Sequence, residues 1–289
     1  MPITARYMAA QHVARRAGQL AHELFVNHKA FAADSSPDEY VAHGLRAISA
    51  QIMSKLAAAF PADVFDVDCS TDTDTDRLWM IEAIDGERNF KRDIPFYAIA
   101  ITYVDLGRAE AAVVYDPERD EMFHALRDQG AWCEHEGREI RLEVAPGIAL
   151  EQSLISVALD EGAPEGAALA LRRELIDAGA AARVFGAPAL ELAHVAAGRL
   201  DGFVGLGLEA RALMGALLLV EEAGGYASQV QEGGDARIDP PIVGCAPSIA
   251  RSINAINAAW NAEGSAGQPE MATSAHGRGH SARAVRLSP

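Results

Sequence analysis

The segment with the clearest chemical potential is residues 79–90, with the sequence Trp-Met-Ile-Glu-Ala-Ile-Asp-Gly-Glu-Arg-Asn-Phe. An apolar run typical of a buried strand carries two carboxylates, Glu82 and Asp85, three residues apart. Carboxylate oxygens, together with a backbone carbonyl such as that of Ile84, are ligands that Mg²⁺ takes in proteins. The spacing therefore predicts a site for a hard divalent cation where the strand ends.

The glycine that follows the carboxylates indicates a second kind of ligand. Gly86 lets the backbone approach a phosphate closely, and the amides of residues 86–88 can point at its oxygens if a helix begins there. An acidic stretch just upstream, residues 66–76, is close enough to contribute another metal ligand. The alternative is that Glu82 and Asp85 only bracket a turn and face water, which is the commoner situation for an isolated carboxylate pair.

The elements that must position this segment can be predicted from hydrophobic periodicity. Residues 8–29 and 38–59 repeat apolar residues at helical spacing, and Ser36-Pro37 opens the second helix. Strand-like runs follow at 78–84, 96–105, 110–115, 121–125 and 130–133.

From Ser153 the pattern changes to alternating strands and helices. Strands are predicted at 154–158 and 201–204, and helices at 167–178, 190–197 and 212–223. We therefore divide the chain into an N-terminal α+β half carrying the metal and phosphate motif (1–150), a C-terminal α/β half (151–262) and a disordered tail (263–289) without periodicity.

Composition and charge narrow the classes of partner. The chain has 289 residues and a formal net charge of −16, which argues against nucleic acid, because phosphate backbones are bound by clustered Lys and Arg. No apolar run has the ~20 residues of a membrane helix, so no membrane partner is expected. The three cysteines, Cys69, Cys133 and Cys245, show no CxxC pairing, and a reducing cytoplasm fits best.

Several motifs in a fixed order extend the pattern beyond residues 79–90. They are Pro95-Phe96, Val113-Val114-Tyr115-Asp116-Pro117, Gly130-Ala131-Trp132, residues 190–202 (Leu-Glu-Leu-Ala-His-Val-Ala-Ala-Gly-Arg-Leu-Asp-Gly) and residues 220–225 (Val-Glu-Glu-Ala-Gly-Gly). Over residues 5–260 this co-linear set resembles the inositol monophosphatase family of metal-dependent phosphatases. The resemblance implies a layered αβαβα sugar-phosphatase fold in a homodimer. It also implies a Mg²⁺ cofactor and a small phosphorylated metabolite as substrate.

The resemblance also implies a set of site residues in this chain. Together with the residues of the motif, it predicts metal ligation by Asp68, Glu82, the Ile84 carbonyl and Asp85, phosphate binding by Gly86, Glu87 and Arg88, and catalytic roles for Asp85 and Glu87. From its charge, Arg211 is expected to contact the substrate.

Several of these positions depart from the family's pattern. Asp68 stands where the family has Glu, Glu82 stands where it has Asp, and Glu87 replaces a Thr that helps to activate water. In the late motif, Arg211 and Ala212 replace Trp and a metal-binding Asp. An exchange of Asp and Glu moves the carboxylate by about 1.5 Å, which matters because Mg²⁺ demands near-ideal octahedral geometry.

These departures leave two functional hypotheses. In the first, the chain is a Mg²⁺-dependent phosphomonoesterase with a rearranged site, in which Arg211 supplies part of the missing positive charge. In the second, it is a pseudo-phosphatase that binds a ligand or a partner without turnover. Glu87 could be a new ligand or general base, or could repel phosphate. Gly205 stands where the family has an acidic substrate contact, so the substrate is left open.

A third interpretation belongs to a different class of protein. Residues 205–210 (Gly-Leu-Gly-Leu-Glu-Ala) match a GxGxxA dinucleotide-binding turn. A single match of this kind is a frequent false positive, and the family pattern explains the same residues as a strand-to-helix connection.

Overall fold

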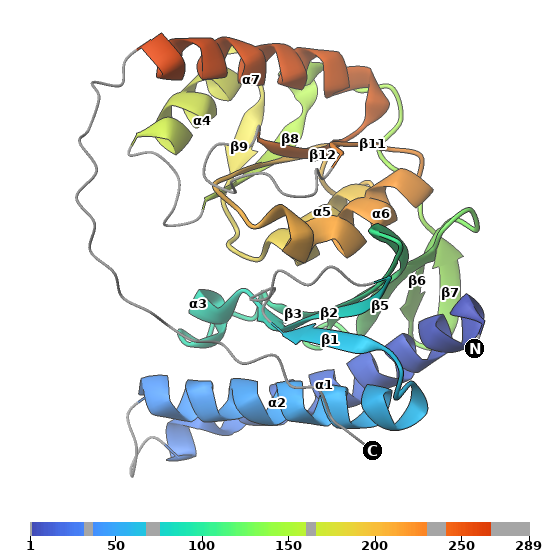
Figure 1. The fold of residues 1–289 in the computed structure, drawn as a ribbon. Helices are drawn as coiled ribbons and strands as arrows, with labels where there is room; N and C mark the ends of the chain where they lie inside the picture. Colours follow the sequence, from blue (N-terminus) through green and yellow to red (C-terminus); the bar gives the residue numbers. More distant parts are fainter. Residues whose placement is uncertain (1, 32–36, 68–75, 160–165, 230–240, 267–289) are drawn as a thin grey trace.

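The computed structural model of the chain describes residues 2–31, 37–67, 76–159, 166–229 and 241–266. Five layers alternate along the vertical direction of Figure 1. A helix pair, α1 (Ile3–Phe31) and α2 (Pro37–Ala59), lies under a seven-stranded sheet. Above that sheet come α5 (Pro188–Ala196) and α6 (Met214–Glu222), then a five-stranded sheet, then α4 (Ala167–Asp177) and α7 (Pro247–Ala266). This is the predicted αβαβα arrangement.

The seven strands of the first sheet lie side by side in chain order. They are β1 (Val64–Val67), β2 (Arg77–Asp85), β3 (Ala98–Asp105), β4 (Arg108–Asp116), β5 (Glu121–Leu126), β6 (Ala131–His135) and β7 (Arg138–Arg141). β1 and β2 are parallel, and every later neighbouring pair is antiparallel. A short helix, α3 (Glu87–Phe90), directly follows β2.

The second sheet has the order β11-β12-β10-β8-β9. Its strands are β8 (Leu154–Leu159), β9 (Ala181–Arg183), β10 (Gly202–Leu206), β11 (Tyr226–Ala227) and β12 (Ile242–Cys245). β8 pairs in parallel with both β9 and β10, whereas β12 runs antiparallel to β10 and β11.

Residue size on the two faces of the first sheet explains the layering. Large residues such as Ile99, Ile101 and Tyr103 pack against α1 and α2, while the alternate residues Ala98 and Ala100 face α5 and α6. A small-residue face allows a helix to approach closely. Gly215 of α6 uses this room, because a Cβ there would lie 2.0 Å from Thr102 Oγ1 of β3.

Most predicted boundaries differ from the structure by a few residues, and two of these differences bear on the site and the tail. The predicted helix 212–223 is a 3₁₀ turn, η2 (Ala210–Leu213), followed by α6. The predicted tail begins at residue 263, whereas α7 extends to Ala266, and residues 267–289 lie outside the described part of the chain.

A buried ion pair fastens α1 to the first sheet. Arg6 donates from Nε and Nη2 to the two carboxylate oxygens of Asp63, at 2.7 Å each. The indole of Trp79 on β2 donates to the same carboxylate at 3.0 Å. The Arg6 guanidinium also lies over the rings of Phe60 and Tyr103, 4.9 and 4.7 Å from their centroids. These contacts satisfy both charges where water is excluded.

The Asp63→Asn variant is expected to lose about 3 kcal/mol of unfolding free energy, because it leaves the buried Arg6 without a countercharge. Urea denaturation of the two proteins measures the difference. The matched control is Asp177→Asn, which breaks an exposed i,i+4 pair with Arg173 and should cost less than about 1 kcal/mol. Equal losses in both variants would contradict a stabilising role for the buried pair.

Candidate active site

A β-bulge in β2 brings the two predicted carboxylates to one face of the sheet. Glu82 pairs with Ala100 of β3 and Asp85 with Ala98, so three steps on β2 match two on β3. In a regular strand, residues three apart point to opposite faces. With the bulge, Glu82 and Asp85 both lie on the face shared by Ala98 and Ala100, toward α5 and α6.

The Asp85 side chain is fixed by the first turn of α5. Asp85 is 6% exposed, and its Oδ2 accepts a hydrogen bond from the Leu190 amide at 2.9 Å. Residue Ala187 at the helix N-cap supplies no side-chain cap, so this carboxylate from the other half of the chain satisfies one of the unpaired amides of α5. The partial positive charge of a helix N-terminus also favours a carboxylate there.

Burial dominates the acidity of Asp85. Desolvation raises its pKa to about 7, against the opposing effect of the hydrogen bonds from the Leu190 and Ala189 amides, and the nearby Glu191 charge raises it further. Without a cation the carboxyl is therefore half protonated near neutral pH. A bound divalent cation would favour the charged form.

A second buried carboxylate, Glu191, holds the same helix end. Its Oε1 accepts from the Ala187 amide at 2.9 Å, and Oε2 accepts from the Ser156 hydroxyl of β8. A side chain that reaches back to the N-cap amide resembles the glutamate of a capping box. Burial raises the pKa of Glu191. Its contacts hold α5 against the second sheet while Asp85 holds it against the first.

Gly86 and Asn89 close the seam between the two halves. Gly86 has φ +89°, and a Cβ there would lie 2.9 Å from Ala187 Cβ and 3.0 Å from the Phe96 carbonyl. Asn89 Nδ2 donates to the carbonyls of Phe96 and Phe185, at 2.9 and 2.7 Å. The glycine is therefore required both by its positive φ and by the close approach of the 185–187 loop.

The predicted phosphate-binding residues form the short helix α3. Glu87 and Arg88 are exposed at its first turn, where helix amides have no preceding turn to pair with. The Glu87 carboxylate pairs with Lys91 at 2.6 Å, and Lys91 also lies 3.6 Å from Asp38 of α2. This pairing tethers Glu87 on the surface of α3 and raises the pKa of Lys91.

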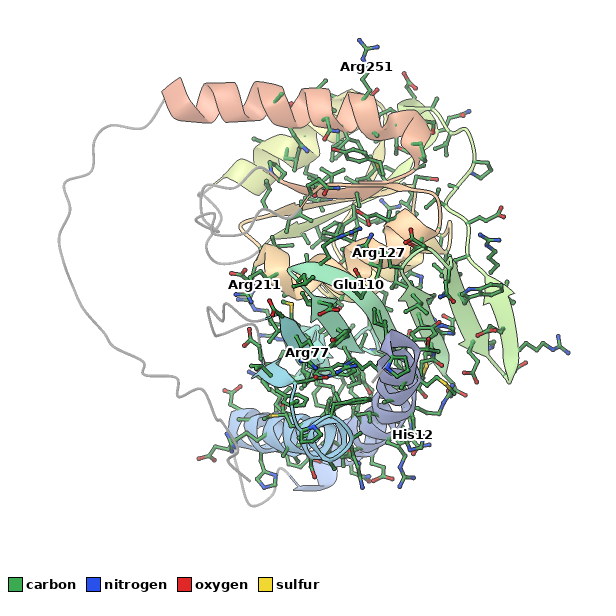
Figure 2. All side chains as sticks on the ribbon, turned by 45° about the vertical axis from the view of Figure 1, so that its right-hand side comes forward. His12, Arg77, Glu110, Arg127, Arg211 and Arg251 are labelled. Carbon is green, nitrogen blue, oxygen red and sulfur yellow. The ribbon has the colours of Figure 1, made fainter. Side chains whose placement is uncertain are left out.

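Arg211 and Ala212 lie in the 3₁₀ turn η2, which contacts β2. Arg211 is half-buried, and Figure 2 shows it at the junction between the seven-stranded sheet and the helical layer above. Met214, directly after η2, packs against Leu78 and Met80, which lie on the same face of β2 as Glu82. The late motif thus approaches the strand that carries the carboxylates.

The described residues supply only part of the predicted metal site. Asp68 lies outside them, and among the described residues no group of three His, Cys, Asp or Glu is arranged to hold a metal ion. Glu82 and Asp85 are nevertheless a donor pair that suits Mg²⁺, which is often bound through one or two carboxylates together with waters and substrate phosphate. The donor chemistry fits Mg²⁺ at this face.

Asp66, Glu191 and Asp116 are among the buried acids that the sequence analysis did not single out. Asp66 on β1 is 1% exposed and in register with Met80, on the same face as Glu82. Glu191 was named only within the motif at residues 190–202 and was given no role of its own. An acidic residue in the first turn of a predicted helix is a signal that could have indicated its capping role. Asp116 is fully buried, and its Oδ1 accepts hydrogen bonds from the amides of Glu118 and Arg119 at 3.0 and 3.2 Å. These bonds form an Asx turn, which the Asp-Pro step in the sequence indicates.

His194 is a packing residue rather than a reactive one in this structure. Its ring stacks on Phe96, 5.8 Å between centroids, and its Nδ1 lies 3.3 Å from Nη1 of Arg199. Arg199 is itself held by a bidentate pair with Glu121, at 2.6 and 2.5 Å. Burial lowers the pKa of His194 to about 4, so the ring is neutral at physiological pH.

The GxGxxA segment does not form a dinucleotide-binding turn. Such a turn leads directly from a strand into an α-helix whose N-terminus receives the pyrophosphate. Here β10 ends at Leu206, and the 3₁₀ turn η2 separates it from α6. A Cβ on Gly205 would meet Leu208 Cδ1 at 2.5 Å, so protein side chains occupy that space.

Comparison with known proteins agrees with this fold. Residues 4–264 match the inositol monophosphatase family. The chain is 32% identical over 250 residues to Nus factor SuhB of Escherichia coli K12, covering 84% of this chain and 92% of that protein. It is 33% identical over 205 residues to an inositol-1-monophosphatase of Mesorhizobium japonicum, covering 69% of this chain and 75% of that protein. It also resembles the crystal structure of the extragenic suppressor protein suhB from Bartonella henselae, with a TM-score of 0.74 and 26% identity over 88% of this chain and 99% of that one.

The layered fold and the carboxylate-bearing strand define a phosphatase-type hydrolase at the level of the family. The chain belongs to the inositol monophosphatase family. Members of this family are generally Mg²⁺-dependent. In the described residues, no helix is long and apolar enough to cross a membrane.

The Gly86→Ala variant is expected to lose about 3 kcal/mol or more of unfolding free energy, because it adds a steric clash to an unfavourable positive φ. Gly137→Ala is the matched control, since Gly137 has φ +70° and a Cβ added there would meet nothing within 4 Å. It should lose only the ~1 kcal/mol of the backbone term. Thermal or urea denaturation gives both values, and similar losses would contradict the close approach of the 185–187 loop.

The pKa of Asp85 predicts how metal-free stability varies with pH. Because the folded state holds the proton more tightly than the unfolded state, this group stabilises the fold most below its ordinary pKa of 3.8, and that contribution is lost as pH rises through about 7. Between pH 5 and 7, wild type should lose up to ~1.4 kcal/mol per pH unit relative to Asp85→Asn. Urea denaturation in EDTA checks this, and parallel pH profiles would contradict it.

Proposed function

We propose that the chain is a Mg²⁺-dependent phosphomonoesterase that hydrolyses a small sugar or inositol phosphate. The observation that carries the proposal is the bulge in β2, which places Glu82 and Asp85 on one face directly before the glycine and the first turn of α3. Cation ligands and phosphate-binding amides are then adjacent, as a metal-dependent phosphatase requires. The inositol-1-monophosphatase of Mesorhizobium japonicum among the relatives supports the same substrate class.

In this proposal each residue has a defined task. Glu82, Asp85 and the Ile84 carbonyl hold the cation, with Asp68 as a further ligand, and the amides of Gly86, Glu87 and Arg88 hold the phosphate. When bound, Mg²⁺ supplies charge neutralisation on the phosphoryl oxygens and lowers the pKa of water.

In the same proposal, Glu87 acts on the proton of the attacking water and Arg211 acts on the substrate. Glu87 accepts the proton of the attacking water, and Lys91 holds its carboxylate in place through the 2.6 Å pair. Arg211 contributes positive charge to the substrate beside the position of Ala212, where the family resemblance places a metal-binding Asp. A homodimer of this kind in the cytoplasm is part of the same proposal and rests on the family resemblance.

The second candidate is a pseudo-phosphatase that binds a ligand or partner. Ala212 favours it, since it offers no carboxylate to a second cation. The hydrogen bond from the Leu190 amide, which competes with a cation for Asp85 Oδ2, favours it as well. The Escherichia coli relative is named as a Nus factor rather than as a phosphatase. A partner-binding role is therefore the alternative against which catalysis must be tested.

Calorimetric titration of Mg²⁺ and Mn²⁺, with release of inorganic phosphate from myo-inositol 1-phosphate measured in parallel, separates the two candidates. Wild type should bind the cation and release phosphate. Asp85→Asn should reduce turnover by about 10²-fold or more, whereas the exposed-acid control Asp177→Asn should not change it. Ala212→Asp, which restores a carboxylate, should strengthen cation binding.

Two results would contradict catalysis by this site. Absence of both cation binding at millimolar metal and phosphate release would leave the pseudo-phosphatase as the function. Phosphate release that survives in Asp85→Asn at the wild-type rate would show that the chemistry lies elsewhere in the chain.

A further inference from the structure

A cavity of about 220 Å³ lies away from the candidate active site, at the seam between the two halves of the chain. One wall is formed by the β3–β4 turn and by Arg127, which follows β5. The other wall is formed by α6 and by the residues after β11, including Gln229. Cavities at such seams are common ligand sites. No residue that lines it belongs to the site built around Asp85 and Gly86.

The Arg127 side chain is held rigidly in this cavity. Its Nε donates to the Ala109 carbonyl at 2.8 Å, and its Nη1 donates to Glu221 Oε2 of α6 at 3.2 Å. Glu110 Oε1 lies 3.7 Å from Nε, and Figure 2 shows Arg127 and Glu110 together in the middle of the molecule. A guanidinium that is already immobilised loses little further entropy when it binds a ligand.

These contacts engage only part of the guanidinium. They use Nε and Nη1, and none of the described residues gives Nη2 a partner. Arg127 lines the cavity and its side chain is only 18% exposed. A hydrogen bond from its remaining N–H groups to an oxyanion would form in a partly desolvated environment, where charge-assisted hydrogen bonds are strong.

The rest of the lining supplies a second cation and an apolar surface. Arg108, at the start of β4, is exposed and forms no ion pair with any residue in the described part of the chain. Leu217 and Leu218 of α6 are buried and present an apolar wall. Two cations, Arg108 and Arg127, therefore line the cavity. The carboxylates of Glu221 and Glu110 both lie beside Arg127, and Arg108 is the cation with no carboxylate paired to it in the described part of the chain.

From this geometry we propose that the cavity binds a small organic oxyanion. A carboxylate or phosphate group would accept hydrogen bonds from Arg127 and Arg108, and the carbon skeleton would lie against Leu217 and Leu218. The planar fork of arginine matches both kinds of oxyanion. The site is separate from the proposed active site and does not depend on the proposed function.

Titration calorimetry of the full chain in EDTA, with malonate and inorganic phosphate as two separate probes, tests the proposal. Wild type should bind at least one of them with a dissociation constant in the millimolar range, and the arm that responds identifies the oxyanion. Arg108→Glu should weaken binding about tenfold or more, because it replaces an attraction by a repulsion across the cavity. Arg127→Lys keeps the charge but loses the fork, and it should weaken binding as well.

Two controls make the outcome decisive. Arg251→Glu reverses an exposed charge on α7, far from the cavity (Figure 2), and should bind like wild type. Asp85→Asn should also bind like wild type, because Asp85 does not line the cavity and the asparagine side-chain oxygen can still accept the Leu190 hydrogen bond. No binding of either probe, equal weakening in Arg108→Glu and Arg251→Glu, or a loss confined to Asp85→Asn would each overturn the proposal.

Discussion

The hydrogen bond from the Leu190 amide to the Asp85 carboxylate is the contact on which the candidate site depends. It joins the last residue of β2 to the first turn of α5, and therefore joins the two halves of the chain at the point where the proposed chemistry occurs. Glu191 fixes the same turn to β8 through Ser156, and Gly86 and Asn89 close the loop beneath it. Together these contacts hold the first turn of α5 against the end of β2.

This contact also sets the protonation chemistry of the site. The amides and the dipole of a helix N-terminus favour the charged form of a carboxyl buried there, whereas the loss of hydration disfavours it. For Asp85 the loss of hydration is the larger effect, because its pKa rises to about 7. Asp85 is thus poised between a neutral and a charged capping group near neutral pH. In the proposed function, a cation and a phosphate would share this face, and the same carboxylate would serve both the fold and the chemistry.

The order of elements, the layered fold and the motif could be predicted from sequence because periodicity and motif spacing are local signals. The bulge could not, because it depends on the register between β2 and β3 rather than on residues 79–90 alone. The ion pair of Arg6 with Asp63 joins residues far apart in sequence and carries no local pattern. Helix α6 starts later than predicted, because apolar periodicity does not distinguish a 3₁₀ turn from the first turn of an α-helix. The predicted ligand Asp68 lies outside the described residues, and the roles of the other predicted site residues stay predictions.

Hydrogen exchange at the Leu190 amide in metal-free protein tests the central claim most directly. If the Asp85 carboxylate caps α5, exchange at this amide, measured above pH 7 where the group is charged, should be about tenfold or more faster in Asp85→Ala than in wild type, since a hydrogen bond to a charged group contributes about 1.5–3 kcal/mol. Amides in α7 should exchange equally in both proteins. Equal exchange at Leu190 in the two proteins would contradict the account, because the two halves would then not be joined through Asp85.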